Sequence, residues 1–219
     1  MKKYIVLLLL VVFLAGCSNE SKSVKDNFVS KMEKKDVYLM KGTMSITSNE
    51  DTFAYNIVAA RNKEDYRVNL VNQINNHEQV ILKSGEDVYV VTPSLNKSFK
   101  FQSEWPSNGS QGYLIDSLVT DIKNDAEATE EKTDDGYVIT TKVNYPNNAS
   151  LVKEKIYLNK DEDITKVLVI DANDNVKITV NYSSVDFKPT FKDDYFKLES
   201  LIDVCVRNMV NENFTEEQA

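Results

Sequence analysis

Apolar and polar residues alternate with a period of two over most of the chain, which is the pattern of half-buried β-strands. The clearest case is 37–46, where Tyr38, Met40, Met44 and Ile46 fall on one face. The segments with this rhythm are 37–46, 52–61, 66–74, 78–93 (two strands around a Gly85 turn), 97–102, 136–146, 153–161, 163–174 and 175–187, with 128–135 as an added edge strand. Short turns rich in Asn, Asp and Gly separate them, so the pattern predicts an antiparallel meander of about eleven strands.

Three segments have helical spacing instead, at 23–35, 112–125 and 199–214. Ser23 is a suitable cap for the first helix. No change of composition separates the two halves of the chain, so we predict one domain. A twisted sheet of this many strands is expected to curl. The predicted fold is therefore mainly β (α+β), a half-barrel made of a single curved antiparallel sheet with about three helices on its concave side.

The start of the chain has the layout of a secretory signal peptide. Lys2 and Lys3 give a basic start, 4–13 is an uncharged apolar run, and 14–16 is Leu-Ala-Gly, followed by Cys17. The apolar run is shorter than the roughly 20 residues that a spanning helix needs. Leu-Ala-Gly-Cys resembles the lipobox of bacterial lipoproteins, which implies cleavage before Cys17 and attachment of a diacylglyceryl group to its sulfur.

That resemblance divides the chain into a signal peptide at 1–16, a polar tether at 17–23 and a half-barrel domain at 24–219. Two acyl chains, such as palmitate, anchor a protein stably where one would not. We therefore expect the mature protein to be attached through Cys17 to the cell membrane, on its extracytoplasmic face. An ordinary signal peptide with a chance cysteine is the alternative reading.

Charge and cysteine content narrow the functional class. The formal net charge is −8, and loss of two lysines with the signal peptide makes it −8 − 2 = −10. A surface this acidic argues against a nucleic-acid partner. The two cysteines are Cys17 and Cys205, so acylation of the first leaves no disulfide available. Cys205 falls on the apolar face of the last predicted helix, which favours a buried thiol.

Candidate chemistry is sparse, and we predict neither enzymatic activity, nor a metal, nor a cofactor. His77 is the only histidine and lies in a turn, where solvation is the simpler reading. The acidic run 124–135 could attract a basic partner, but such runs are usually solvated. The segment 171–175, Asp-Ala-Asn-Asp-Asn, lacks the Gly and Glu of an EF-hand loop and is better read as a turn. Trp105 and Tyr113 could border a binding surface or belong to the core.

Two segments carry a family resemblance. The segment 80–101 resembles a stretch typical of the LolA/LppX-like lipoprotein-carrier superfamily, and 155–187 is similar to the later hairpins of that superfamily. The positions that match are Gly85, Tyr89, Pro93 and Asn96 in the first segment and Asp171 and Asn175 in the second. The resemblance implies the same half-barrel fold. It also implies a concave apolar cavity able to take lipid or lipoprotein acyl chains.

Within that superfamily the chain looks most like the germination lipoproteins of the GerS type from spore-forming clostridia. The features shared are the lipobox, the chain length, the Lys- and Asn-rich composition and the Trp-Pro loop before the second helix. This likeness implies an anchored, non-enzymatic protein that binds and activates a cell-wall amidase of the CwlD type, needed for spore germination. It also implies that two copies could pair by strand exchange. A carrier of lipid or acyl chains is the alternative function.

Overall fold

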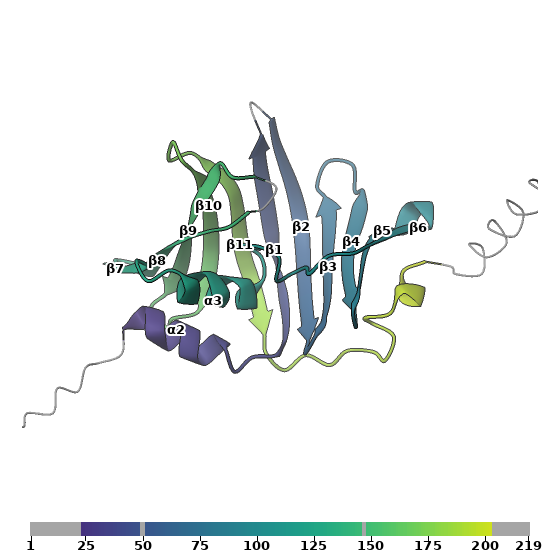
Figure 1. The fold of residues 1–219 in the computed structure, drawn as a ribbon, viewed down its shortest axis with the longest axis horizontal. Coiled ribbons are helices and arrows are strands. Elements are labelled where there is room, and N and C mark those ends of the chain that lie inside the picture. Colours follow the sequence, from purple (N-terminus) through teal and green to yellow (C-terminus); the bar gives the residue numbers. More distant parts are fainter. Residues whose placement is uncertain (1–22, 49–50, 146–147, 203–219) are drawn as a thin grey trace, which may run out of the picture.

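The computed structural model describes residues 23–48, 51–145 and 148–202. Its strands form one open antiparallel sheet of eleven strands (Figure 1). The strands are β1 Val37–Ser48, β2 Asp51–Asn62, β3 Asp65–Asn72, β4 Glu78–Ser84, β5 Asp87–Thr92, β6 Lys97–Phe101, β7 Thr129–Thr133, β8 Gly136–Lys142, β9 Leu151–Asn159, β10 Ile164–Asp171 and β11 Val176–Asp186. The prediction of a single mainly β sheet of about eleven strands, including the added edge strand, is confirmed.

The sheet consists of two meanders that meet in its middle. Its strand order is β6-β5-β4-β3-β2-β1-β11-β10-β9-β8-β7, so the first strand pairs with the last. Strands β6 and β7 are consequently the two outer strands, at opposite ends of the sheet (Figure 1). Turn residues with positive φ include Gly85 at +61° and Asn96 at +51°, two positions of the family resemblance. Left-handed backbone of this kind is tolerated best by Gly and Asn.

Gly42 lies at the seam between the two meanders, where the pairing of β1 with β11 shifts register. A Cβ placed on Gly42 would lie 2.0 Å from the carbonyl oxygen of Asn181. The backbones therefore approach more closely here than any residue with a side chain allows.

Two α-helices of the described chain pack on one face of the sheet, which we call the helix face. They are α2 Val24–Met32 and α3 Ile115–Asn124, and short 3-10 turns form η1 Pro93–Leu95 and η2 Leu198–Ser200. Ser23 caps α2 by accepting a hydrogen bond from the Asp26 backbone N–H, as predicted. The third predicted helix, 199–214, lies mostly outside the described residues. Within the described ranges, no helix is long and apolar enough to cross a membrane.

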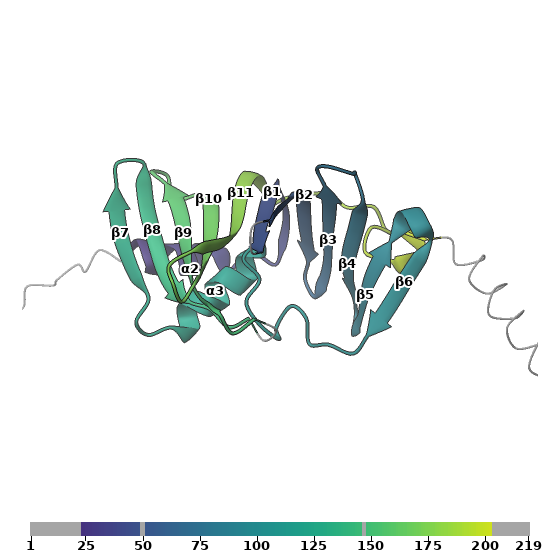
Figure 2. The same cartoon turned by 90° about the horizontal axis from the view of Figure 1, so that it is seen from above.

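The helices bury the core against the half of the sheet formed by β7 to β11 and β1. Phe28 and Met32 of α2 are buried there, together with Leu118 and Ile122 of α3. The connection from β6 back to α3, residues 102–114, runs along the same side of the sheet (Figure 2). The core is therefore closed on one half of the helix face, and only the connection covers the other half.

The chain after β11 packs on the opposite face of the sheet behind β3, β4 and β5, which the sequence pattern did not predict. The Arg67 guanidinium lies 4.6 Å from the centre of the Tyr195 ring and donates a hydrogen bond to the Tyr195 carbonyl. Farther along, Ile202 packs on Val80 and Val91 of β4 and β5. This return fixes the end of the described chain behind the outer strands of the first meander.

Candidate functional site

Asp116 of α3 fastens the helix to the sheet. The Tyr38 hydroxyl donates to Oδ1 of Asp116 and the Tyr66 hydroxyl donates to Oδ2, each at 2.8 Å. The Arg61 guanidinium lies 3.8 Å from the same carboxylate. Burial raises the pKa of both phenols, and the negative charge of Asp116 raises it further. Both tyrosines are therefore neutral hydrogen-bond donors, and Asp116 acts as a structural acceptor.

The connection 102–114 crosses the helix face next to this anchor. Trp105 is only 6% exposed and its ring meets the Tyr66 ring edge to face, with centroids 5.8 Å apart. Tyr113 also packs against the core and donates a hydrogen bond to the Gln111 side chain. The structure places the Tyr113 ring in the core, and it bears out both readings for Trp105, which is buried and also reaches the wall of a pocket.

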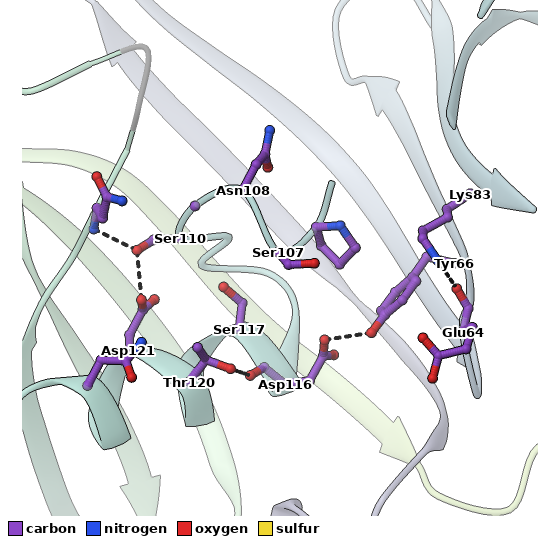
Figure 3. Close-up of a pocket in the computed structure, with 14 residues that line it drawn as sticks. Glu64, Tyr66, Lys83, Ser107, Asn108, Ser110, Asp116, Ser117, Thr120 and Asp121 are labelled. Carbon is purple, nitrogen blue, oxygen red and sulfur yellow. Dashed lines mark hydrogen bonds between the residues drawn. The ribbon is translucent and has the colours of Figure 1, made fainter. Parts of the chain in front are cut away.

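A polar pocket of about 260 Å³ lies between α3, the connection and strands β3 and β4 (Figure 3). Its lining residues are Glu64, Tyr66, Lys83, Pro106, Ser107, Asn108, Gly109, Ser110, Asp116, Ser117, Thr120, Asp121, Asn124 and Asn144. The Lys83 ammonium donates a hydrogen bond to the Glu64 carbonyl at the rim. Figure 3 shows Asp121 and Ser110 on the side of the pocket opposite Lys83 and Tyr66.

Two buried carboxyl groups, Asp121 in the wall of this pocket and Glu154 on β9, have fewer hydrogen-bond donors than oxygens. Ser110 donates a hydrogen bond of 2.9 Å to Oδ1 of Asp121. The other oxygen of Asp121 and both oxygens of Glu154 have no partner among the described residues. Glu154 is 0% exposed. Burial, and then the charge of Asp121, raise the pKa of Glu154 well above its usual range, and burial raises the pKa of Asp121 to about 6.

In the described chain, strand neighbours and tyrosines surround Glu154. Glu154 lies on β9 between Thr141 of β8 and Val169 of β10. Burial, and then the nearby Glu154, raise the pKa of the phenols of Tyr145 and Tyr182. We therefore interpret Glu154 as a carboxyl that is held protonated inside the core.

A second pocket of about 400 Å³ lies along the connection, next to Trp105 and Tyr145. Asn108 and Ser110 line both pockets, so the two are contiguous along the connection. The second pocket is partly lined by residues of the connection and partly by Phe101 of the outer strand β6.

The apolar side chains of the helix face continue beyond the area that the helices cover. Strand pairing places six apolar residues in one row across β1 to β6: Met40, Ala59, Val68, Ile81, Val90 and Phe99. The first three are fully buried, Ile81 and Val90 are half-buried, and Phe99 is 66% exposed. Leu70, the partner of buried Ile57, is also half-buried on this face.

We call Leu70, Ile81, Val90 and Phe99 the open apolar surface. It spans the four strands β3 to β6 and ends at an outer strand of the sheet. A row of partly exposed apolar side chains that ends at an open sheet edge marks a binding surface or an aggregation-prone site. The arrangement is therefore suited to holding an apolar partner by contact.

The predicted lipidation residue Cys17 and the predicted buried thiol Cys205 both lie outside the described residues. His77 lies exposed in the turn between β3 and β4. The segment 171–175 is a turn in which Asp171 accepts the backbone N–H groups of Asn173 and Asn175, each at 2.9 Å. The turn reading of this segment is confirmed.

The acidic run 124–135 forms the end of α3, a turn and strand β7. One of its members holds two elements together, because the Glu130 carboxylate accepts the backbone N–H groups of Val24 and Lys25 at the start of α2. A negative charge at a helix N-terminus is favourable. Among the described residues, no group of three or more His, Cys, Asp or Glu side chains could hold a metal ion.

Sequence reasoning missed Asp116, Asp121 and Glu154. For Glu154 a signal was present, because it occupies an inward position of its strand, in step with Ile156 and Leu158. A carboxylate at such a position indicates a buried polar group. For Asp116 and Asp121 no such signal existed, since acidic residues are ordinary on one face of an amphipathic helix.

Residues 1–196 match the family described as "Sporulation protein YdcC-like". The sporulation protein YdcC of Bacillus subtilis (strain 168) is 36% identical over 201 residues, an alignment that covers 89% of this chain and 60% of the relative. The chain thus spans about 60% of the length of that curated relative.

Similar folds occur in solved structures at low sequence identity. An uncharacterized conserved protein from Thermus thermophilus matches with a TM-score of 0.52 at 8% identity, covering 80% of this chain and 93% of that one. The structure of the CwlD amidase from Clostridioides difficile in complex with the GerS lipoprotein gives a TM-score of 0.46 at 16% identity, with 78% and 99% covered. A LolA superfamily protein from Nitrosomonas europaea gives 0.40 at 13% identity, with 82% and 100% covered.

Proposed function

The chain belongs to the family of YdcC-like sporulation proteins, and on that premise we propose that it is a lipid-anchored, non-enzymatic protein that binds and activates a cell-wall amidase during sporulation. The observation that carries the proposal is the open apolar surface, a row of side chains that leaves the core and ends exposed at β6. A protein partner that covers this row completes the core of the half-barrel.

The anchor and the apolar surface belong to opposite ends of the molecule. Six residues, 18–23, separate Cys17 from the start of α2, and an extended chain spans about 3.5 Å per residue, or roughly 20 Å in all. The start of α2 is bound to β7 through Glu130, whereas the apolar surface ends at β6. Ten strand spacings of about 4.8 Å put these edges on the order of 50 Å apart along the sheet. A lipid anchor at Cys17 therefore leaves the apolar surface accessible to a partner outside the bilayer.

The protein's own side chains already fill part of the helix face, which favours a protein partner over a bound acyl chain. Helices α2 and α3 occupy half of that face with their own side chains. The pockets beside them hold about 260 and 400 Å³ and are lined largely by hydroxyl, carboxamide and charged groups. A carrier of acyl chains needs an apolar cavity instead, because small-molecule sites bury most of the surface of their ligand and an acyl chain is apolar.

The proposal is tested by capturing partners from sporulating cells with tagged versions of the chain. We expect the unaltered chain to recover an amidase and Phe99→Glu to lose it, because a carboxylate on the apolar row cannot be desolvated cheaply. Ile74→Glu is the matched control, since Ile74 is 82% exposed on the β3–β4 turn and lies outside the open apolar surface.

Each outcome has a defined meaning. Recovery of the amidase by the unaltered chain and by Ile74→Glu, but not by Phe99→Glu, supports the proposal. Equal recovery by all three would refute the role of the surface. Recovery of lipid with no protein partner would favour the carrier function instead.

A further inference from the structure

The second pocket has a lining of unusual composition. Four of its nine residues carry a carboxamide: Gln102, Asn108, Gln111 and Asn148. None of the nine is charged, although 27% of the chain is Asp, Glu, Lys or Arg. We call it the carboxamide pocket. A ligand with a net charge would lose its hydration there without gaining an opposite charge, so the pocket suits a neutral ligand.

Three aromatic rings complete the wall: Phe101, Trp105 and Tyr145. Trp105 and Tyr145 are held by the core, since Trp105 packs on Tyr66 and the Tyr145 hydroxyl accepts the backbone N–H of Gly112. Flat rings that cannot move aside offer rigid apolar surfaces. The pocket thus combines fixed apolar faces with carboxamides.

The carboxamides that line the pocket keep donor or acceptor atoms that the described chain does not use. Asn108 donates to the Ser103 hydroxyl, which leaves its carbonyl oxygen, and Gln111 accepts from Tyr113, which leaves its NH₂ group. Asn148 accepts from Ser150, and the Gln102 side chain makes no hydrogen bond to the rest of the described chain. A carboxamide offers two donors and a two-lone-pair acceptor, so the pocket presents both kinds of group together.

We propose that the carboxamide pocket binds a neutral glycan bearing acetamido groups. A pyranose ring has an apolar C–H face that fits an aromatic ring, and hydroxyl groups at its rim that fit carboxamides. An acetamido substituent carries one N–H donor and one C=O acceptor, which a carboxamide side chain pairs with directly. The volume of about 400 Å³ is within the usual range for small-ligand sites.

The neighbouring polar pocket extends the site for a longer ligand. It shares Asn108 and Ser110 with the carboxamide pocket and adds Lys83 and three acidic side chains, Glu64, Asp116 and Asp121. A glycan chain that continues along the connection would place further polar substituents there. The carboxamide pocket and the open apolar surface share no residue, although Phe101 and Phe99 lie two positions apart on β6, so separate variants test the glycan site and the proposed amidase partner.

The experiment titrates the full chain, in a detergent without a sugar headgroup, with chitotetraose, a neutral tetramer of N-acetylglucosamine. Trp105 is the only tryptophan of the chain and lines the pocket, so its fluorescence reports binding directly. Calorimetry in parallel detects a ligand that binds without changing the surroundings of Trp105. We expect saturable binding, weaker binding of maltotetraose, which lacks acetamido groups, and no binding of a neutral tetrapeptide.

Variants locate the site. Gln102→Ala and Asn148→Ala are each expected to weaken binding of chitotetraose by about 5- to 10-fold, the effect of one lost hydrogen bond between neutral groups. Asn173→Ala, in the exposed β10–β11 turn, is the control and is expected to bind like the unaltered chain. Absence of saturable binding, binding of the tetrapeptide alone, or unchanged affinity in both pocket variants would overturn the proposal.

Discussion

Replacing Glu154 by leucine is expected to stabilise the protein, although Glu154 lies in the middle of the core. The carboxyl is 0% exposed and neither of its oxygens has a partner in the described chain. A buried polar group without a hydrogen bond costs about 1–3 kcal/mol. Leucine has nearly the same size and removes that cost. We therefore expect Glu154→Leu to raise the free energy of unfolding by about 1–3 kcal/mol at pH 8.

The gain should depend on pH in a defined direction. Burial raises the pKa of Glu154 well above its usual range and that of Asp121 to about 6. Between an unfolded pKa of about 4 and a higher folded pKa, the folded chain binds more protons than the unfolded chain, so stability falls as pH rises. For Asp121 this window runs from about 4 to about 6, and for Glu154 it extends higher. The unaltered protein should therefore lose stability from pH 5 to pH 8, and Glu154→Leu should lose less.

The assay is urea unfolding of the full chain at pH 5 and pH 8, followed by circular dichroism. Glu131→Gln, which removes a carboxylate from the exposed strand β7, is the control and should leave the pH dependence unchanged. A domain of this size gains roughly 2–4 °C in Tm per kcal/mol, so thermal melts give a second readout. Equal destabilisation by Glu154→Leu at both pH values would refute the reasoning, since it would mean that the carboxyl makes favourable contacts.

Three further changes probe the anchor of α3, the seam of the sheet and the membrane attachment. Asp116→Ala removes the hydrogen-bond acceptor of both Tyr38 and Tyr66. It should lower the free energy of unfolding, measured in urea, by about 3 kcal/mol. A loss below about 1 kcal/mol would contradict the anchoring role of Asp116. Gly42→Ala puts a Cβ 2.0 Å from the Asn181 carbonyl oxygen. It should lower the free energy of unfolding by about 2 kcal/mol or more in the same assay. Unchanged stability would disprove the close approach of the two strands. Cys17→Ser should move the protein from the membrane fraction to the soluble fraction without changing its circular dichroism, and incorporation of labelled lipid into this variant would count against acylation of Cys17.

The fold was predictable from the sequence because one signal repeats along the chain. The period-two alternation marked ten of the eleven strands, and the positions Tyr38, Met40 and Met44 lie on one buried face as the pattern predicts. Strand β7 has no apolar residue and was expected only as an added edge strand. Helix α3 begins at Ile115, whereas helical spacing placed its start at 112. The residues before it belong to the connection, where the Ser117 hydroxyl accepts the backbone N–H of Gln111.

The candidate site was less predictable, because it depends on which strands become neighbours across long stretches of sequence. The row that ends at Phe99 exists only through the pairing of six strands, and nothing in the segment 97–102 alone distinguishes an exposed from a buried phenylalanine. The contact of Asp116 with Tyr38 joins residues 78 positions apart. Amphipathic patterns identify inward positions, but they do not identify which part of a sheet the helices leave uncovered.

The most direct measurement adds the purified full chain to the purified amidase recovered from sporulating cells and follows hydrolysis of peptidoglycan. We predict that the chain alone releases nothing, that it increases the rate of the amidase, and that Phe99→Glu fails to do so while Ile74→Glu acts like the unaltered chain. Hydrolysis by the chain alone, or equal stimulation by Phe99→Glu, would contradict a non-enzymatic protein that acts through its open apolar surface.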